Sequence, residues 1–346
     1  MAQTKTIIIP TAFDPAAIVP IPPLDTPITP RENFKRMLDT RNPLYLPNSI
    51  TDTQAIFPEG FFDGPANPFG DGYDQFGVHW TFVPAVGACT PTPGVYAVGD
   101  IERWKTDMQW PDISRTNVDS VRRQAEITPR DKLVGIHIGH GFFERFHHVF
   151  GFEAALMAFL TNPDEVHEIF KRLLDLKIQF IDVMKRAGGG IFDYIIHSDD
   201  MGTQRSSFFS RAVFEEFIFP YNKTLFDYAH EQGMYVHWHS CGDNSNFLDY
   251  MLQLKTDWWE VQSASNDVSA ISEKFGGKIA MQLGLDPDMV YKDGVTDEEM
   301  KAAARKFVDD AARYKNYAVA AGPMGRQMAE IVIPELRRYS LEAFSR

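Results

Sequence analysis

The chain has 346 residues and a formal net charge of −13, with 34 Lys and Arg against 47 Asp and Glu. This balance argues against proteins that hold nucleic acid or an anionic membrane surface through clustered Lys and Arg. Hydrophobic residues make up 44% of the chain, enough for a large core. Because α/β barrels often exceed about 250 residues as one unit, we expect a single domain over residues 1–346.

The cysteines and the first residues indicate the compartment. Cys89 and Cys241 lie far apart in the sequence, and the apolar run near Met1 is too short for the core of a signal peptide. Charged residues or prolines interrupt every apolar stretch before it reaches the roughly 20 residues of a membrane span. We therefore expect a cytoplasmic protein with no membrane partner.

The N-terminal part of the chain is rich in proline. Residues 1–30 contain prolines whose fixed φ and missing N–H predict an extended arm. Thr29-Pro30-Arg31-Glu32 then predicts a helix start, with Thr29 as N-cap, and the helix should end near Thr40. Residues 42–130 combine Pro, Gly and aromatic residues with little periodicity, which predicts a loop-rich part that covers an active site.

Residues 131–346 alternate short apolar runs with amphipathic helical segments. Asn162-Pro163, Ser210 and Thr296 mark helix starts in this part. Strand–helix alternation calls for parallel strands with right-handed crossovers, so the candidate folds are a (β/α)8 barrel and a doubly wound sheet. The predicted strands are Leu133–Ile138, Tyr194–His197, Tyr235–His239, Trp258–Gln262, Ile279–Leu283 and Tyr317–Ala321.

Polar residues decide between the two folds. Nearly every predicted strand is apolar at its start and ends in groups capable of chemistry, such as His137, His197, His239, Glu260 and Gln282. A barrel delivers functional residues from many strand ends to one face, whereas a doubly wound sheet concentrates its ligand at one switch point. We therefore predict a (β/α)8 TIM barrel with an N-terminal Pro-rich arm and long loops over its C-terminal face.

One predicted strand end carries the spacing of a metal site. His237, His239 and Cys241 alternate, so they share one face of a strand. Imidazole nitrogen and thiolate sulfur suit Zn²⁺, which in catalytic sites takes three protein ligands. We expect Glu260, on the following strand, to be the third ligand, ahead of Asp199 and Asp200. The alternative is that His239 and Cys241 pack at the barrel mouth without metal.

The acidic pair Asp199-Asp200 follows another strand directly. One of the two should face the barrel axis, where a carboxylate can orient a histidine, bind a metal or act as a general acid. The other should cap the following turn. Glu144 and Arg145 are adjacent, and we expect them to form an internal ion pair without a catalytic role.

Several motifs together resemble one known family. The chain is similar to the uroporphyrinogen decarboxylase superfamily, and within it to the corrinoid-linked methyltransferase-like branch, which includes O-demethylase components. That resemblance implies a (β/α)8 barrel over nearly the whole chain. The motifs are Thr29-Pro30-Arg31-Glu32-Asn33-Phe34, Asp74-Gln75-Phe76-Gly77-Val78-His79-Trp80, Gly141-Phe142-Phe143-Glu144-Arg145, Asp199-Asp200-Met201-Gly202-Thr203-Gln204, and His239-Ser240-Cys241-Gly242 followed by Gln262.

The resemblance also implies a metal. The methyltransferase branch holds Zn²⁺ with His-x-Cys and a later Cys, and His239-Ser240-Cys241 matches the first two ligands. Where the later Cys is expected, this chain reads Ala320-Ala321-Gly322-Pro323-Met324-Gly325. A carboxylate in its place would make Zn²⁺ harder and better suited to an ether oxygen than to a thiol. The N-terminal arginine motif with which the decarboxylases grip porphyrinogen carboxylates has no counterpart in the Pro-rich region.

These features predict a methyltransferase that moves a methyl group from an O-methyl substrate, an aryl methyl ether, to the reduced corrinoid of a partner protein. The expected partners are thus a small methoxylated aromatic molecule and a corrinoid protein, and a homodimer is a further candidate assembly. The alternatives are a decarboxylase of a tetrapyrrole or aromatic acid, a corrinoid-binding partner without catalysis, and a metal-free lyase. The predicted proton donors or orienting groups are Asp199, Asp200 and His197. The predicted substrate-binding residues are Tyr73, Trp80, Gln204, Gln262 and Asn266.

Overall fold

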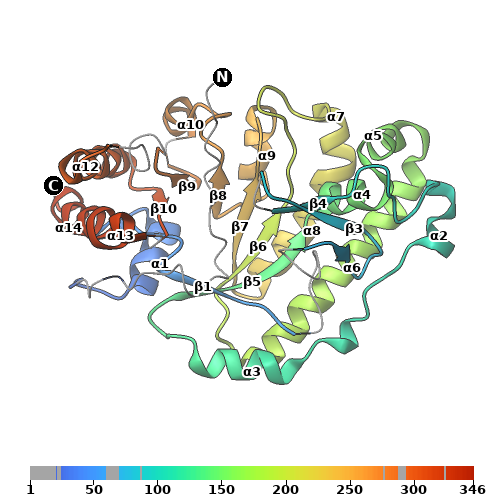
Figure 1. Ribbon diagram of the computed structural model, residues 1–346, viewed down its shortest axis with the longest axis horizontal. Coiled ribbons are helices and arrows are strands. Elements are labelled where there is room, and N and C mark those ends of the chain that lie inside the picture. Colours follow the sequence, from blue (N-terminus) through green and yellow to red (C-terminus); the bar gives the residue numbers. More distant parts are fainter. Residues whose placement is uncertain are drawn as a thin grey trace.

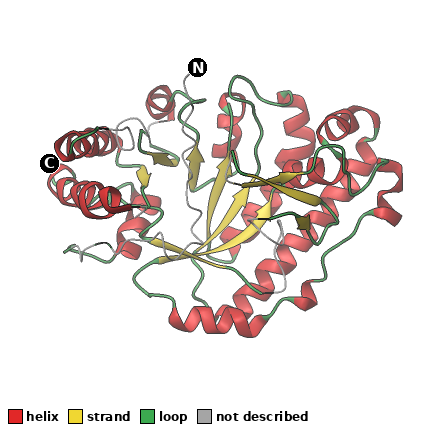
Figure 2. Ribbon diagram, viewed as in Figure 1, coloured by secondary structure: helices red, strands yellow, loops and turns green. Residues whose placement is uncertain are grey.

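A parallel sheet curls through the centre of the molecule, and helices surround it in the computed structural model (Figures 1 and 2). The structure describes residues 21, 25–59, 70–85, 88–275, 277–286, 294–322 and 325–346. The seven-stranded sheet has the order β1-β5-β6-β7-β8-β9-β10, and every neighbouring pair is parallel. Most of the predicted Pro-rich arm lies outside the described residues.

All six predicted strands are present. The strands of this sheet are β1 (Thr53–Ile56), β5 (Leu133–His140), β6 (Tyr194–Ser198), β7 (Tyr235–Ser240), β8 (Trp258–Val261), β9 (Ala280–Gly284) and β10 (Tyr317–Ala320). The sequence did not predict β1, which lies in the part expected to be loop-rich. Only Ile56 of β1 is buried, so its apolar pattern is too weak to be seen in the sequence.

The segment before β1 joins the two ends of the sheet. Ser49 N donates to Val319 O at 2.9 Å, and Val319 N donates to Pro47 O at 2.9 Å, which pairs this segment with β10. A few residues later the same chain forms β1 and pairs with β5. This closure gives the TIM-barrel fold that was predicted, with seven strands rather than eight assigned in the described part of the chain.

Three helices begin where their sequence signals indicate. Thr29 accepts a hydrogen bond from Glu32 N at the start of α1, Ser210 accepts one from Val213 N, and Thr296 forms a capping box with Glu299. The helices are α1 (Pro30–Thr40), α2 (Trp104–Asp107), α3 (Val118–Ile127), α4 (Phe142–Phe150), α5 (Phe152–Thr161), α6 (Pro163–Gly188), α7 (Arg211–Val213), α8 (Phe219–Glu231), α9 (Leu248–Gln253), α10 (Val268–Phe275), α12 (Asp297–Tyr314), α13 (Gly325–Gln327) and α14 (Ile333–Ala343).

A small antiparallel sheet lies beside the barrel, near α4 (Figure 1). It has the order β2-β3-β4, with β2 (Gly72–Tyr73), β3 (His79–Val83) and β4 (Ala88–Pro91). Trp80 of β3 is buried, and its ring centroid lies 5.4 Å from that of His140 and 4.9 Å from that of His148. The region expected to be loop-rich therefore also contributes a sheet that packs on the C-terminal end of β5.

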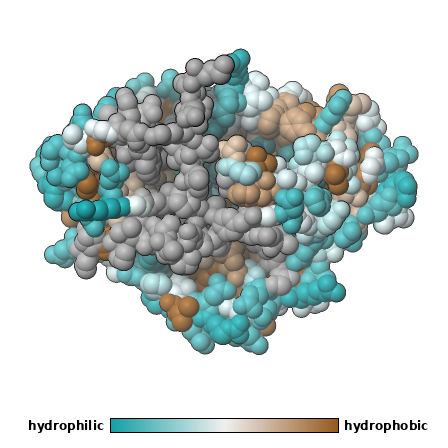
Figure 3. Space-filling view, viewed as in Figure 1, coloured by the Kyte–Doolittle hydropathy of each residue, from teal (hydrophilic) through white to brown (hydrophobic). Residues whose placement is uncertain are grey.

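Strand alternation separates the core from the barrel interior. On β7, Val236 and Trp238 are buried and belong to the hydrophobic core between the strands and the helices, whereas His237 and His239 line the interior. Hydrophilic side chains cover much of the rim of the face in Figure 3. None of the helices in the described ranges combines the length and apolarity needed to cross a bilayer.

Candidate active site

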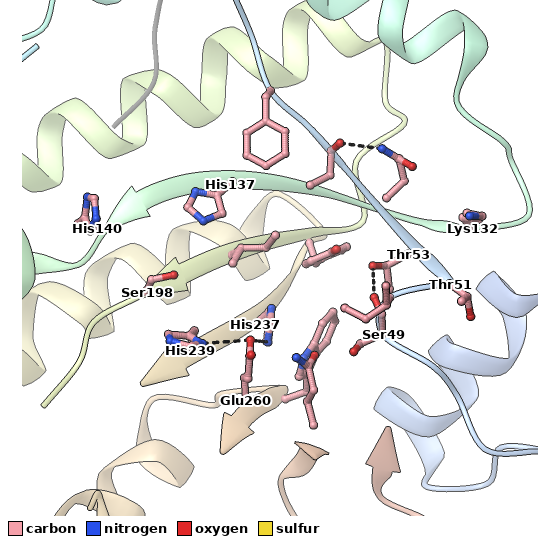
Figure 4. Close-up of a pocket in the computed structure, with 18 of the residues that line it drawn as sticks. Ser49, Thr51, Thr53, Lys132, His137, His140, Ser198, His237, His239 and Glu260 are labelled. Atoms are coloured by element: carbon pink, nitrogen blue, oxygen red, sulfur yellow. Dashed lines mark hydrogen bonds and ion pairs between the residues drawn. The ribbon is translucent and has the colours of Figure 1, made fainter. Parts of the chain in front are cut away.

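A pocket of about 1070 Å³ runs through the barrel interior. Alternate residues of successive strands line it, and Figure 4 shows His137, Ser198, His239 and Glu260 on different strands around it. Aromatic residues Phe57, Tyr194 and Trp258 contribute apolar wall. Among the described residues that line the pocket, Lys132 is the only Lys or Arg, while several histidines and carboxylates face it.

A bulge in β5 brings a second histidine to the pocket. The register with β6 shifts between His137 and His140, and Gly139 has a φ of +74° in that interval. Without the bulge, residues three apart would point to opposite faces of the strand, but here both histidines line the pocket. Lys177 of α6 donates to the carbonyls of Ile138 and His140 at 3.1 and 2.5 Å and so fixes this irregular strand end.

Three donor groups gather where β6 and β7 end. The ligand atoms of Asp200, His239 and Cys241 all lie within 4.8 Å of one another. His239 Nε2 lies 3.4 Å from Cys241 Sγ and 3.6 Å from Asp200 Oδ1. Two donors at Zn–N and Zn–S bond lengths of roughly 2.0 and 2.3 Å with a tetrahedral angle stand about 3.5 Å apart. The nitrogen, sulfur and oxygen donors therefore fit Zn²⁺ in type and spacing.

Glu260, the expected third ligand, contacts the other nitrogen of His239. Its Oε2 lies 3.1 Å from His239 Nδ1 and 3.6 Å from His237 Nε2. Burial opposes ionisation of Glu260, but the hydrogen bond with His239 holds its pKa down at about 2. With Nδ1 bound to Glu260, His239 presents Nε2 to Cys241 and Asp200. The expected third ligand Glu260 thus lies at Nδ1 of His239, whereas Asp200 lies on the Nε2 side with Cys241.

Asp199, expected as a catalytic candidate, anchors a helix. Its carboxylate accepts backbone hydrogen bonds from Phe142, Phe143 and Glu144 at 3.0, 3.3 and 2.8 Å, at the N-terminus of α4. Burial raises the pKa of Asp199 to about 7, against these donors, which favour the charged form. The sequence suggested that one of the two aspartates caps the following turn. Instead, Asp199 caps a helix from another part of the chain.

His197, the third candidate proton donor, lies behind the barrel wall. The side chain is fully buried, and its ring packs against Phe142, Phe226 and Trp238. The pocket-lining residues of β6 are Tyr194, Ile196 and Ser198, which have the opposite strand parity. His197 therefore does not face the pocket, because alternation directs it to the helices.

The three polar residues expected to bind substrate support the turn that carries Cys241. Gln262 Oε1 accepts from Gly242 N at 2.8 Å and from Gln204 Nε2 at 3.2 Å, and Asn266 Nδ2 donates to Gly242 O at 2.8 Å. Gly242 has a φ of +79°, and a Cβ there would lie 2.0 Å from Gly202 O. None of Gln204, Gln262 and Asn266 lines the pocket in the described part of the chain. Their contacts support the turn that carries Cys241 and Gly242.

The two aromatic residues expected to cover a substrate ring lie in the small sheet. Tyr73 is 62% exposed and packs on His79, whereas Trp80 is buried and donates to Asp74 Oδ2 at 3.0 Å. Neither residue lines the described pocket. The aromatic residues that do line it come from the barrel itself, because the small sheet packs beside the strand ends rather than over the cavity.

Three residues that sequence analysis did not select also form a cluster. The donor atoms of His140, Glu144 and His148 lie within 4.8 Å of one another. Burial raises the pKa of Glu144 well above its usual range, helped by Asp200 and Asp199, and its Oε2 is buried with no hydrogen-bond partner among the described residues. The regular spacing of His140, Glu144 and His148 was the available signal. We expected Arg145 to form an ion pair with Glu144, but in the structure it forms one with Asp74.

Comparison with known proteins agrees with this architecture. The family model described as Uroporphyrinogen decarboxylase (URO-D) matches residues 74–323. The chain belongs to this family. A solved methyltransferase from Methanosarcina mazei has a TM-score of 0.56 at 13% identity, covering 79% of this chain and 77% of that chain.

A chitinase from Chromobacterium violaceum has a TM-score of 0.40 at 9% identity, with coverage of 82% and 91%. No curated protein matches the sequence. At such identities the structural similarity to the methyltransferase shows the fold alone.

Proposed function

We propose that this URO-D family protein is a methyltransferase that takes the methyl group of an aryl methyl ether and passes it to the reduced corrinoid of a partner protein. The observation that carries the proposal is the Asp200–His239–Cys241 donor set beside the pocket. The fold shared with the Methanosarcina mazei methyltransferase supports it. The substrate would enter the barrel interior, where Phe57, Tyr194 and Trp258 offer surfaces for an aromatic ring.

The site residues divide into ligands and an orienting group. His239, Cys241 and Asp200 would hold Zn²⁺, and Glu260 would fix the ring of His239 through Nδ1. Zn²⁺ bound by these donors supplies Lewis-acid polarisation of an ether oxygen. The hydrogen bond from Cys241 N to Asp200 Oδ1, 2.6 Å long, joins the ends of β6 and β7 and keeps two ligands together.

The proposed reaction requires stabilisation of the leaving oxygen atom. In methyl transfer to the reduced corrinoid, the C–O bond of the ether would break, and the electron pair of that bond would remain on oxygen as phenolate. Phenolate is a poor leaving group, so catalysis depends on groups that stabilise negative charge as it develops. A buried site without water would strengthen each of those interactions.

The charge of the pocket disfavours the alternative, a uroporphyrinogen-type decarboxylase. A polycarboxylate substrate requires several cationic side chains, but Lys132 is the only Lys or Arg among the described pocket residues. Glu260 also lines the pocket, and the whole chain carries a net charge of −13. These charges would repel a polyanion, whereas a neutral methoxyarene meets no such barrier.

Two measurements test the proposal. Elemental analysis should find one Zn²⁺ per chain, lost in Cys241→Ser. Incubation with a reduced corrinoid protein and a panel of methoxyarenes should produce the absorbance of the methylated corrinoid together with the free phenol. Full activity in the metal-free protein would overturn the Zn²⁺ role. Release of CO₂ from a tetrapyrrole or aromatic acid, without methyl transfer, would favour the decarboxylase.

A further inference from the structure

A buried chain of polar contacts ends at one pocket histidine. Asp74 Oδ2 lies 2.6 Å from Arg145 Nη1, and both of these side chains are fully buried. Arg145 Nη2 in turn lies 3.0 Å from Nδ1 of His140. Trp80 donates to the same Asp74 oxygen at 3.0 Å and stacks on the His140 ring, with centroids 5.4 Å apart and an interplanar angle of 21°. Arg145 therefore contacts the edge of the His140 imidazole, and Trp80 contacts its face.

These contacts fix the proton on His140. A guanidinium has only donors, so His140 Nδ1 must accept the hydrogen bond from Arg145. A histidine that accepts at Nδ1 is neutral and carries its single proton on Nε2. Protonating Nδ1 would bring one donor against another donor, beside a buried positive charge. The neutral Nε2–H form is thus maintained by Asp74 through Arg145.

The same argument decides what the cluster of His140, Glu144 and His148 can bind. Metal binding by histidine needs a lone pair on a ring nitrogen. In His140, the lone pair of Nδ1 is used by Arg145 and Nε2 bears the proton. The ring is therefore prepared to donate a hydrogen bond and not to ligate a cation.

His140 also has the right position for a role in catalysis. The β5 bulge brings it to the pocket that His239 and Glu144 line. Figure 4 shows His140, Ser198 and His239 at the same end of this pocket. A substrate oxygen directed to the Asp200–His239–Cys241 donors would thus occupy the end of the pocket where His140 is found.

We propose that His140 is a catalytic hydrogen-bond donor, whose Nε2–H stabilises the negative charge that develops on the leaving phenolate oxygen. This inference rests on the proposed function, because it concerns the oxygen released in methyl transfer. His140 keeps its proton in this step, and the electron pair from the broken C–O bond stays on the phenolate. Arg145 and Asp74 are positioning residues, since they fix the tautomer and orientation of the donor without touching substrate.

The loss of turnover on removing the His140 donor should resemble the loss seen when other preorganised donors are removed. Removing one donor from a site of this type lowers turnover by about 10²–10³-fold. A donor at the phenolate should also favour ionisation of a bound phenol. We expect wild-type protein to lower the pKa of bound 4-nitrophenol by about one unit more than a protein without the donor, a tenfold change in its ionisation constant.

The test uses Zn²⁺-loaded protein and 4-nitrophenol, whose phenolate absorbs visible light, with no corrinoid present. His140→Phe keeps an aromatic ring beside Trp80 and removes the donor, so it should lose the shift. His140→Gln offers an oxygen to Arg145 and an amide donor to the ligand, so it should restore part of the shift. His79→Phe is the matched control: His79 lies in the small sheet and does not line the described pocket, so the shift should remain.

The outcomes separate this inference from the proposed function. Zn²⁺ content is measured for each variant, so that an altered metal is not mistaken for a lost donor. A wild-type shift that persists in His140→Phe would overturn the role of His140 while leaving methyl transfer intact. Wild-type protein that binds no phenol and demethylates no methoxyarene would overturn both. If His140→Phe does not fold, His140→Met removes the donor with a more adaptable side chain.

Discussion

The two carboxylates beside His239 have different roles at the scale of single residues. Asp200 lies 3.6 Å from Nε2, whereas Glu260 lies 3.1 Å from Nδ1. Only one nitrogen of an imidazole binds a metal, and the other donates to a group that fixes the ring. The sequence placed Glu260 on the strand that follows His239, but it could not show which nitrogen each carboxylate would contact.

Metal affinity should distinguish these roles. Asp200→Ala removes a ligand and should leave a site with two protein ligands that holds Zn²⁺ weakly. Glu260→Gln keeps all three ligands, so affinity should fall only by about 10–100-fold. Competition with a chromophoric chelator measures both values. Asp249→Asn, an exposed position paired with Lys274, is the control and should bind Zn²⁺ as the wild type does. A larger loss in Glu260→Gln than in Asp200→Ala would return Glu260 to the ligand set.

The pocket histidines show why the candidate site was only partly predictable. His239 and Cys241 stood out because two residues at strand spacing reveal a shared face. His140 and Arg145 did not, since their function depends on Asp74, a residue distant in the sequence whose contact arises only when the small sheet packs on β5. The bulge at Gly139 adds a second difficulty, because regular alternation would have placed His137 and His140 on opposite faces.

At the scale of elements, α4 owes its position to Asp199. Gly141 precedes the helix and has no side chain to cap it, so the first amides of α4 depend on a carboxylate from the end of β6. This contact also sets the place of Glu144, the third residue of the helix. The fold therefore separates the acidic pair: Asp199 caps α4, whereas Asp200 lies beside His239 and Cys241.

Stability measurements should separate the members of this pair. Asp199→Ala leaves buried amides without an acceptor and should lower the free energy of unfolding by about 1–3 kcal/mol. Amide hydrogen exchange at Phe142 to Glu144 should accelerate together with this loss. Asp200→Asn should instead lower turnover far more than stability, because its side chain is partly exposed beside His239 and an amide oxygen still accepts from Cys241 N. Denaturant titrations of both variants provide the measurement, and equal destabilisation would contradict the division of roles.

Strands were predictable where both faces of the sheet are covered. The six predicted strands begin with apolar residues and are largely buried in the structure, as expected for strands covered on both sides. β1 is different because its sequence Thr-Gln-Ala-Ile has one buried residue, and its pairing with β5 is imposed by closure of the ring. Its existence depends on contacts between distant parts of the chain rather than on its own composition.

At the scale of the whole molecule, the ring closes around Asp52. Its Oδ2 accepts from Asn48 N at 2.9 Å, and its Oδ1 accepts from Arg337 of α14 at 2.7 Å. Asn48 continues the closure, since its Nδ2 donates to Ala321 O at 2.9 Å beyond β10. Arg337 also lies over the Tyr45 ring at 4.3 Å. One buried carboxylate thus joins the segment before β1, the end of β10 and the C-terminal helix.

Removing that carboxylate should weaken the whole fold. Asp52→Ala leaves the buried Arg337 charge without its partner, which typically costs about 3–5 kcal/mol, and frees the closing segment from α14. Urea unfolding should therefore show one cooperative transition at a much lower midpoint. Adding Arg337→Met removes the unpaired charge, so the double variant should regain part of the lost stability. A single substitution that leaves the midpoint unchanged would show that hydrogen bonds between the backbone of residues 47–49 and β10 suffice to close the barrel.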